Sequence, residues 1–192
     1  LKTPYVVRAH GCYRILKKYF GYKASLGVEA IETEALKKAS HLICVSKNSQ
    51  RMYEETFGNK GTIITNGVTS TTQNISETLP FSLFFFGSVT AKKGFEIALN
   101  VFKRILQKFP TATLHIVGKN YENYLKEKNL GEQKNVINYG HLQGEELKIT
   151  LQKADVFIFP SQGETFGLAL CEAMEIGKAI VAADIPSFRD II

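Results

Sequence analysis

Short apolar runs alternate with amphipathic segments along nearly all of the 192 residues. The run Leu83–Phe86 is apolar at every position, as expected for a parallel strand whose two faces are both covered by helices. After a loop, residues 95–109 carry apolar side chains at helical spacing and end before Pro110. Strands that alternate with helices require right-handed parallel crossovers, so the sequence predicts an α/β fold with doubly wound parallel sheets.

The same pattern locates the other elements. Strands are expected where apolar and β-branched residues cluster, at residues 5–7, 41–45, 62–64, 113–118, 136–140, 156–159 and 179–182. Helices are expected at residues 27–39, 47–56, 121–128, 144–154 and 165–176. The first of these helices has apolar residues at helical spacing: Val28, Ile31, Ala35, Leu36 and Ala39. Ser46 stands where the next helix requires an N-cap.

A polar and aperiodic segment at residues 71–80 divides the chain, and we expect it to be an interdomain linker. Residues 1–70 are then the C-terminal part of a first Rossmann-like domain, and residues 81–192 are most of a second one. The chain opens at Leu1 without a Met or a signal-peptide pattern, which predicts an internal segment of a longer protein. Both domains are therefore expected to be incomplete.

The excess of positive charge is confined to the N-terminal part of the chain. Residues 1–70 contain 11 Lys or Arg against 5 Glu, which accounts for the whole net charge of +6. Residues 8–23 combine Lys and Arg with aromatic residues and contain no Asp or Glu. This composition favours an anionic membrane surface or an acidic acceptor. An ordinary solvated face explains the same pattern, and charge alone does not separate the two.

The remaining composition favours a folded protein in a reducing compartment. The hydrophobic fraction of 44% supports a core, and no apolar run approaches the length of about 18 residues that a membrane span requires. Cys12, Cys44 and Cys171 are an odd, widely spaced set in apolar surroundings, which favours free buried thiols and a cytoplasmic location. Because the sequence shows no recognised nucleic-acid-binding motif, nucleic acid is not expected as a partner.

Ligands of doubly wound sheets bind at the carboxyl ends of the strands, and three such ends carry candidate residues. The first is the loop Gly87–Gly94, which contains Ser88 and places Lys93 directly before a helix. A lysine beside a helix N-terminus favours an anion, because the side-chain charge and the free backbone N–H groups act together. The spacing of a Walker P-loop is absent, and surface lysines near loops are also common.

The second strand end is the segment 160–173, which reads Pro-Ser-Gln-Gly-Glu-Thr-Phe-Gly-Leu-Ala-Leu-Cys-Glu-Ala. If its helix begins near Thr165, the N–H groups of Phe166, Gly167 and Leu168 lack intrahelical partners and point outward. Glycine at position 167 would also let a ligand approach the backbone closely. The segment is therefore a candidate phosphate site.

Two carboxylates belong to the same segment. Glu164 stands at the turn, and Glu172 stands among apolar residues, where a carboxylate needs a partner such as a ribose diol. A helix-start Glu and a solvent-facing Glu explain these two residues equally well. The third strand end is His10-Gly11, where a lone histidine is more often structural than catalytic.

Together these residues resemble a known family, the retaining GT-B glycosyltransferases with a Glu-x7-Glu motif, called glycosyl transferases group 1. The most specific element is Pro-Ser-x-x-Glu-x-Phe-Gly-Leu-x-x-x-Glu-Ala, which contains Glu164 and Glu172. Further matching segments are Gly87–Gly94, His115–Gly118, Asn66–Val68 and Ala39–Ser46. The resemblance covers nearly the whole chain and implies a GT-B fold, in which two Rossmann-like domains enclose the active site and the C-terminal one binds the donor.

The resemblance also implies an activity and a role for each candidate residue. A hexose would pass from a nucleoside-diphosphate sugar to an acceptor hydroxyl with retention of configuration. Lys93, with Gly87 and Ser88, would hold the diphosphate, and Glu172 would hold the nucleotide ribose. The remaining roles concern the donor sugar and its phosphate, and they fall to Glu164, to the amides of Phe166, Gly167 and Leu168, and to His10.

No metal or other cofactor is implied, because a lysine and a helix dipole would stabilise the charge of the leaving diphosphate. The implied partners are the nucleotide sugar and a sugar or lipid-linked acceptor. The implied setting is cell-surface polysaccharide or glycolipid synthesis, in the cytoplasm or at the inner face of the membrane.

Two departures from the family pattern keep an alternative open. Ser88 stands where the family often has Arg, so one cation directed at the diphosphate is missing. The opening of the N-terminal domain, which carries the family's glycine-rich loop, is absent from the sequence. The alternative function is a catalytically inactive nucleotide-sugar-binding module or fragment. A related epimerase or phosphorylase on the same fold is a further alternative, which acceptor assays would separate.

Overall fold

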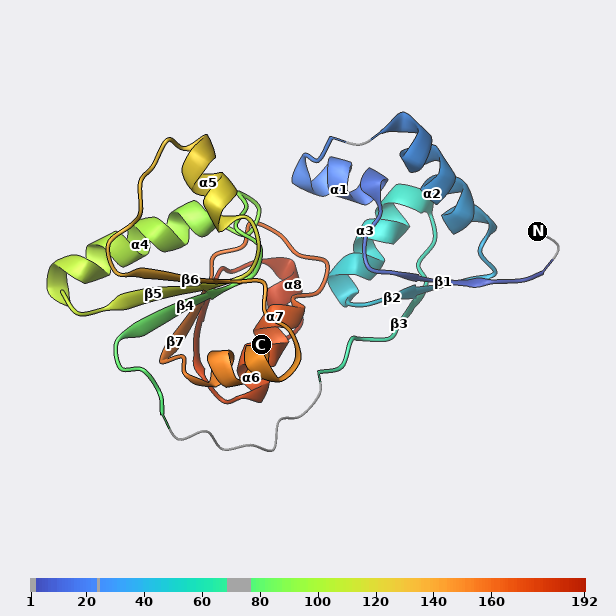
Figure 1. Cartoon of the computed structure of the whole chain (residues 1–192). Helices are drawn as coiled ribbons and strands as arrows, with labels where there is room; N and C mark the ends of the chain where they lie inside the picture. Colours follow the sequence, from blue (N-terminus) through green and yellow to red (C-terminus); the bar gives the residue numbers. More distant parts are fainter. Residues whose placement is uncertain (1–2, 24, 69–76) are drawn as a thin grey trace. The chain divides into compact units, whose positions relative to one another are not determined.

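The computed structural model describes residues 3–23, 25–68 and 77–192. The chain forms two compact units, each described separately below (Figure 1). Unit 1 comprises Leu1–Gly67, Gly163–Gly167 and Ile185–Ile192, and unit 2 comprises Val68–Gln162 and Leu168–Asp184. Residues 71–76 of the predicted linker lie outside the described residues.

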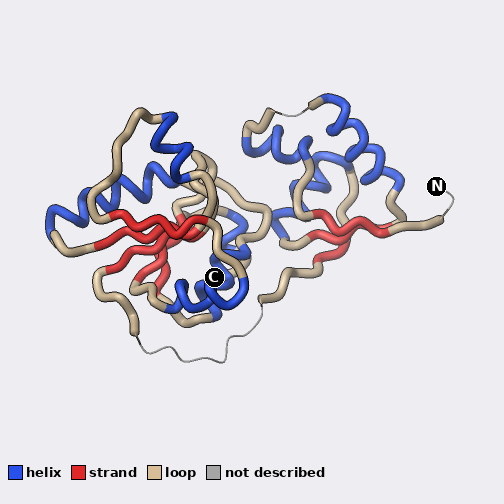
Figure 2. The backbone as a smooth tube through the Cα atoms, in the orientation of Figure 1, coloured by secondary structure: helices blue, strands red, loops and turns tan. Residues whose placement is uncertain are grey.

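Unit 1 contains a three-stranded parallel sheet in the order β1-β2-β3, drawn in red in Figure 2. Its strands are β1 (Val6–Ala9), β2 (His41–Cys44) and β3 (Thr62–Ile63), and its helices are α1 (Tyr13–Phe20), α2 (Leu26–Lys38), α3 (Lys47–Phe57) and α8 (Pro186–Arg189). Strands and helices bury one shared set of apolar side chains: Ile15, Leu36, Leu42, Cys44, Met52 and Tyr53. The strands are short and form few backbone hydrogen bonds, so the packing of this core is what holds the sheet against its helices.

The N-terminus of α3 is capped as the sequence predicts. The Ser46 hydroxyl accepts from the Ser49 backbone N–H at 2.9 Å, and the Ser46 N–H donates to the Ser49 hydroxyl at 2.9 Å. This reciprocal capping box satisfies backbone donors that a helix start otherwise leaves without partners. The predicted N-cap at Ser46 is confirmed.

Helix α2 buries only part of the face that its apolar spacing indicates, namely Leu36. Val28 is 42% exposed and Ile31 is 72% exposed, whereas the buried residues of α2 are Thr33 and Leu36. The cause is a pair of carboxylates on α2 that engage α1. Glu32 accepts from the Tyr13 backbone N–H at the start of α1 at 2.7 Å, and Glu29 lies 3.5 Å from the Lys17 ammonium.

These contacts orient α2 toward α1 through its polar side and leave the Val28 side in solvent. The carboxylate of Glu32 also lies at the positive end of the α1 dipole, which stabilises it there. Periodicity detects an apolar stripe, but it does not tell which side of the helix packs when charged contacts compete.

Unit 2 contains a five-stranded parallel sheet in the order β6-β5-β4-β7-β8. Its strands are β4 (Ser82–Phe86), β5 (Thr113–Val117), β6 (Val136–Gly140), β7 (Val156–Phe159) and β8 (Ala179–Ala182). Its helices are α4 (Phe95–Lys108), α5 (Tyr121–Glu127), α6 (Gly144–Gln152) and α7 (Leu168–Glu175). Helices α4 and α5 lie on one face of the sheet, and α6 and α7 lie on the other (Figure 1). This arrangement confirms the predicted doubly wound sheet.

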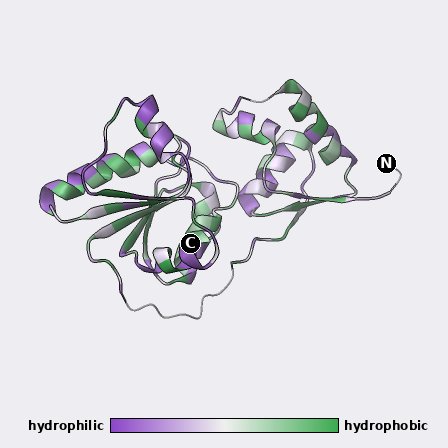
Figure 3. Ribbon diagram, viewed as in Figure 1, coloured by the Kyte–Doolittle hydropathy of each residue, from purple (hydrophilic) through white to green (hydrophobic). Residues whose placement is uncertain are grey.

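The core of unit 2 is rich in aromatic side chains. Phe84, Phe85, Phe95, Phe102 and Phe157 are each no more than 2% exposed. Figure 3 shows the strands of this sheet coloured mostly as hydrophobic, as expected when helices cover both faces. In the described part of the chain, no helix is long and apolar enough to cross a bilayer.

One titratable side chain is buried in this sheet. The ring of His115 is 2% exposed and stacks on Phe84 at a centroid distance of 4.5 Å. Its Nε2 is 2.8 Å from the Thr113 hydroxyl, and its Nδ1 is 3.0 Å from the Tyr139 hydroxyl. Burial disfavours the charged ring and lowers the pKa of His115 from 6.5 to about 4.

The low pKa of His115 predicts a loss of stability in acid. Because the unfolded chain binds this proton more readily, the stability due to the neutral ring is present above pH 6.5 and is lost as the pH falls toward 4. The full difference corresponds to about 3 kcal/mol. We expect His115→Gln to unfold with a weaker pH dependence than wild type between these values in urea titrations. The exposed His141 supplies the control, His141→Gln, and an unchanged pH slope for His115→Gln would contradict the prediction.

Candidate active site

The loops at the carboxyl ends of β4, β5 and β7 pack backbone against backbone. A Cβ built on Gly118 would lie 2.0 Å from the Gly87 carbonyl oxygen, and one built on Gly94 would lie 2.0 Å from the Pro160 carbonyl oxygen. Gly94 also has a φ of +71°, which favours glycine. From β4 the chain adds β5 and β6 on one side of the sheet and then returns to add β7 and β8 on the other side. Doubly wound folds bind ligands at such a point, where the strand order reverses.

Lys93 lies where the sequence analysis expects it, beside Gly87. A Cβ on Gly87 would be 3.8 Å from the Lys93 Cδ, so the lysine stem lies against this glycine. The amides of the following helix are less available than predicted. The Phe95 N–H donates to the Thr90 carbonyl at 3.4 Å, and the Ile97 N–H donates to the Gly94 carbonyl at 3.0 Å. Lys93 is therefore the group of this loop best suited to an anion.

Two neighbouring cavities open around the start of α6. The first, the strand-end cavity, has a volume of about 470 Å³, and its lining includes Gly87, Ser88, Gly118, Lys119 and His141. The second, the helix cavity, has a volume of about 200 Å³, and its lining includes Lys148 and Glu172. Gly144 and Leu147 line both. The candidate residues Gly87, Ser88 and Glu172 thus border adjoining spaces within unit 2.

Glu172 is half-buried on α7 and lines the helix cavity. Burial raises the pKa of its carboxyl above the ordinary value. A carboxylate that has lost part of its water is a stronger hydrogen-bond acceptor for hydroxyl groups placed in the cavity. Glu172 is therefore suited to a diol, and the Lys148 side chain lines the same space.

Helix α7 begins at Leu168 and not near Thr165, which corrects the predicted start. Phe166 and Gly167 precede the helix, so its first-turn N–H groups belong to Leu168, Ala169 and Leu170. The first turn of α7 carries no Asp or Glu, whereas those of α4, α5 and α6 carry at least one Glu each. Among the described helices of unit 2, α7 thus has the N-terminus best suited to a phosphate.

Gly167 has a structural reason of its own. A Cβ at this position would lie 2.8 Å from the Phe188 ring, and the φ of Gly167 is +115°. Phe166 is buried. The packing of Phe166 and Gly167 therefore explains the conformation of the segment before α7 without any ligand.

Glu164 and His10 belong to unit 1. The segment Gly163–Gly167 packs between α1 and α3, because a Cβ on Gly163 would lie 2.2 Å from the Phe20 ring, and the Glu164 carbonyl accepts from the Asn48 amide. A Cβ built on Gly11, the residue after the exposed His10, would lie 3.9 Å from the Thr165 methyl group. The predicted His10 and Glu164 thus lie in segments that meet at one edge of unit 1.

Some residues at these sites carry no sequence pattern that identifies them. Gln143 and Lys148 line the cavities, and the Asn48 side chain, distant in the sequence, donates a hydrogen bond to the Glu164 carbonyl. A single polar residue on a helix has no distinctive spacing, so only the fold reveals its position. In the described residues, no group of three or more His, Cys, Asp or Glu side chains is placed to hold a metal ion.

Comparison with known proteins places this geometry in a context. Residues 69–192 match the family described as glycosyl transferases group 1. A 100-residue part of the chain is 36% identical to the sulfoquinovosyl transferase SQD2 of Arabidopsis thaliana and covers 52% of this chain and 19% of that protein. A 158-residue part is 27% identical to the phosphatidyl-myo-inositol mannosyltransferase of Mycobacterium leprae and covers 78% of this chain and 42% of that protein.

The whole chain is 24% identical to an uncharacterised glycosyltransferase of Methanocaldococcus jannaschii, MJ1178, of which it spans 52%. Solved structures share the fold. The lipopolysaccharide glycosyltransferase WaaG superposes with a TM-score of 0.70 at 16% identity over 97% of this chain and 59% of WaaG. The pneumococcal O-GlcNAc transferase GtfA superposes with a TM-score of 0.67 at 20% identity over 83% of this chain and 33% of GtfA. The chain thus spans about half or less of the length of these curated relatives.

Proposed function

The chain belongs to the glycosyl transferases group 1 family, and from this premise we propose that it serves in the transfer of a hexose from a nucleoside-diphosphate sugar to an acceptor hydroxyl with retention of configuration. The observation that carries the proposal is the adjoining pair of cavities in unit 2. They run from the loops after β4 and β5 past Gly144 and Leu147 to Glu172. Glu172 supplies a hydrogen-bond acceptor at one end of this space and Lys119 a cation at the other, which suits the ribose and the phosphates of a nucleotide.

We assign the donor contacts accordingly. Lys93, beside Gly87 and Ser88, would neutralise the diphosphate, and Glu172 would accept hydrogen bonds from the ribose hydroxyls. The amides that begin at Leu168 would hold a phosphate oxygen at the positive end of α7. Glu164 would bind hydroxyls of the donor sugar, and His10 would lie near that sugar.

The proposed chemistry needs the residues to stabilise the leaving group. The bond between the anomeric carbon and the diphosphate oxygen breaks, and the acceptor oxygen bonds to the same face of that carbon. The proton of the acceptor hydroxyl passes to the departing diphosphate. Lys93 and the N-terminus of α7 would stabilise the charge that develops on this diphosphate, and the proposal includes no metal.

Ser88 favours a second candidate, a module that binds a nucleotide sugar without transferring it. An Arg at this position would add a cation at the edge of the strand-end cavity, which Ser88 does not supply. A weaker hold on the diphosphate lowers stabilisation of the leaving group more than it lowers binding of the nucleoside. Release of nucleoside diphosphate in the presence of acceptor sugars separates the enzyme from the module.

Glu172→Ala is expected to weaken nucleotide binding. Loss of a hydrogen bond to a charged group costs about 1.5–3 kcal/mol, which is about a tenfold to hundredfold loss of affinity. The measurement is a thermal-shift panel of UDP, GDP, ADP and CMP, because a ligand of the folded state raises its stability. One diphosphate should stabilise wild type and the exposed-carboxylate control Glu127→Ala, but not Glu172→Ala. Equal shifts in all three proteins would contradict the ribose assignment.

Lys93→Ala is expected to weaken binding of diphosphates more than binding of nucleosides. The lost charge acts on phosphate oxygens alone, so the advantage of UDP over uridine, or of the matching pair for another base, should shrink by about tenfold. Isothermal titration of both ligands measures this ratio. Lys103→Ala, on the exposed side of α4, is the control. If wild type binds the nucleoside and its diphosphate equally, Lys93 has no such role.

We also propose that unit 1 contacts an anionic membrane surface, since one relative is named a phosphatidyl-myo-inositol mannosyltransferase. The predicted basic segment, residues 8–23, contributes cations, although Lys17 pairs with Glu29 and Lys18 donates to the Glu55 carbonyl. The exposed apolar residues lie beside it on α2, where Leu26 is 79% exposed and Ile31 is 72% exposed. Cations next to exposed apolar residues favour the interface of anionic lipids.

Substitution of both apolar residues, Leu26→Ser with Ile31→Ser, should reduce sedimentation with phosphatidylglycerol vesicles by at least about tenfold. Sedimentation of wild type should fall as salt is added. Val101→Ser, which changes an exposed apolar residue of α4 in unit 2, is the control. Wild type that stays in solution with these vesicles, or a double variant that sediments as well as wild type, would contradict the membrane assignment.

A further inference from the structure

The N-terminus of α3 contacts two other parts of the chain. Its capping residue Ser46 is 3% exposed, and Ser49, its partner in the capping box, is 1% exposed. Segments Gly163–Gly167 and Ile185–Ile192 lie in the same compact unit as this helix, more than a hundred residues later in the sequence. The helix start is therefore a junction of three distant segments.

Two successive carbonyl groups of the later segment are held by side chains at this junction. The Ser46 hydroxyl donates to the Thr165 carbonyl at 2.7 Å, and the Asn48 amide donates to the Glu164 carbonyl at 3.2 Å. A Ser hydroxyl has one proton and two acceptor lone pairs, so Ser46 can accept from Ser49 and donate to Thr165 at the same time. These carbonyls belong to the peptide groups on either side of the Thr165 Cα, so the two bonds hold the planes of the Glu164–Thr165 and Thr165–Phe166 peptide groups.

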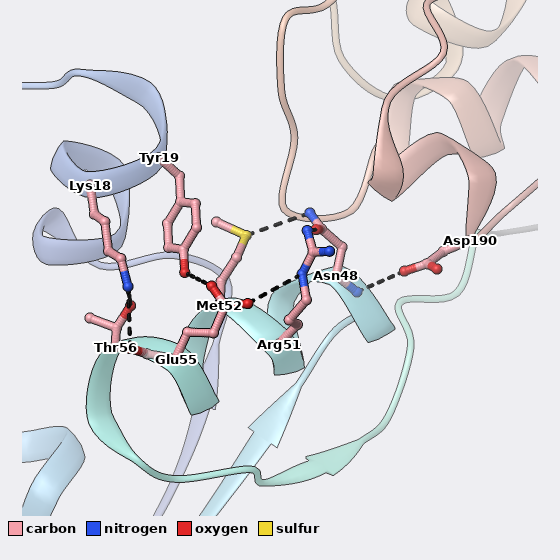
Figure 4. A network of polar contacts seen from close by, with 8 residues as sticks. All are labelled: Lys18, Tyr19, Asn48, Arg51, Met52, Glu55, Thr56 and Asp190. Atoms are coloured by element: carbon pink, nitrogen blue, oxygen red, sulfur yellow. Dashed lines mark hydrogen bonds and ion pairs between the residues drawn. The ribbon is translucent and has the colours of Figure 1, made fainter.

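The amide of Asn48 is itself fixed in orientation. Its Oδ1 accepts from the Arg51 guanidinium at 3.1 Å, and its backbone N–H donates to the Asp190 carboxylate at 2.8 Å (Figure 4). With Oδ1 occupied by a donor, Nδ2 must face the Glu164 carbonyl and the Met52 sulfur, which lies at 3.5 Å. Asn48 thus uses its side-chain donor and acceptor and its backbone donor within this network.

Steric contacts also confine two glycines of this segment. The Phe20 ring leaves no space for a Cβ at Gly163, and the Phe188 ring leaves none at Gly167. Gly163, which precedes Glu164, is therefore confined by α1, Gly167 is confined by α8, and the Glu164 carbonyl is held by α3. These contacts restrict the backbone before and after Glu164, from which its side chain projects.

We propose that Asn48, with Ser46, is a positioning residue that sets the location of the Glu164 carboxylate for the donor sugar. The inference rests on the proposed function, which assigns the sugar hydroxyls to Glu164. Asn48 touches neither the nucleotide nor the sugar in this assignment, and it acts through the backbone of Glu164. Such placement matters because a displacement of about 1 Å at a binding group strongly reduces its effect.

Hydrogen exchange of the chain without ligand tests the clamp itself. Asn48→Asp keeps the acceptor for Arg51 but loses the donor to the Glu164 carbonyl, so exchange in peptide 162–168 should accelerate by about tenfold. Asn59→Asp is the matched control, because the Asn59 side chain accepts from the Gly61 N–H in the same unit, and Asp keeps that acceptor. Unchanged exchange in Asn48→Asp and in Asn48→Ala would overturn the inference.

Ligand binding tests the positioning role. Asn48→Asp should bind the nucleoside diphosphate that wild type prefers within about twofold of wild type, but its hexose conjugate about tenfold more weakly. The probe pairs are UDP with UDP-glucose, GDP with GDP-mannose and ADP with ADP-glucose. A parallel loss for both ligands indicates a merely structural role and overturns the inference. If wild type binds none of the diphosphates, the proposed function fails and the role of Glu164 fails with it, even where exchange shows the clamp.

Discussion

At Gly118 and Gly94 the backbone of one loop touches the backbone of the next, and no side chain fits between them. These contacts bring the ends of β4, β5 and β7 together more closely than side chains would allow. Residues that follow β4, β5 and β6 line the strand-end cavity, among them Ser88, Lys119 and His141. Gly87, Ser88 and Lys93 belong to one of these loops, so their placement depends on the two backbone contacts before it depends on any charged group.

The helices of unit 2 differ in whether their first turns carry a negative charge. Carboxylates in the first turns of α4, α5 and α6 stabilise those helices through the dipole, and they make the same turns unfavourable for a phosphate. Helix α7 lacks this carboxylate, and its start follows the segment that carries Glu164. The half-buried Glu172 lies farther along the same helix, away from the positive end, where its raised pKa reflects burial without help from the dipole.

The sequence is sufficient for the architecture and for the segments that carry chemistry, because both depend on local patterns. Apolar runs locate the strands, and Ser46 locates a helix start to the residue. Helix α1 is absent from the predicted elements although its segment is amphipathic, with Ile15 buried and Lys17 and Lys18 in its last turn. The packing of α2 and the start of α7 depend on contacts with distant segments: Glu29 and Glu32 turn α2 toward α1, and the close fit of Gly167 against Phe188 holds the residues before α7 out of the helix.

The N–H groups at the starts of α3 and α7 find their partners in different ways. At α3 the free amides are satisfied within the protein, by the Ser46 hydroxyl and by the Asp190 carboxylate, and the side chains left over bind the carbonyls of Glu164 and Thr165. At α7 the sequence supplies no carboxylate in the first turn, which is the arrangement that favours an anion at a helix start. Between Glu164 and Glu172, the carbonyls of Glu164 and Thr165 are thus held by α3, and the first turn of α7 contains no acidic residue.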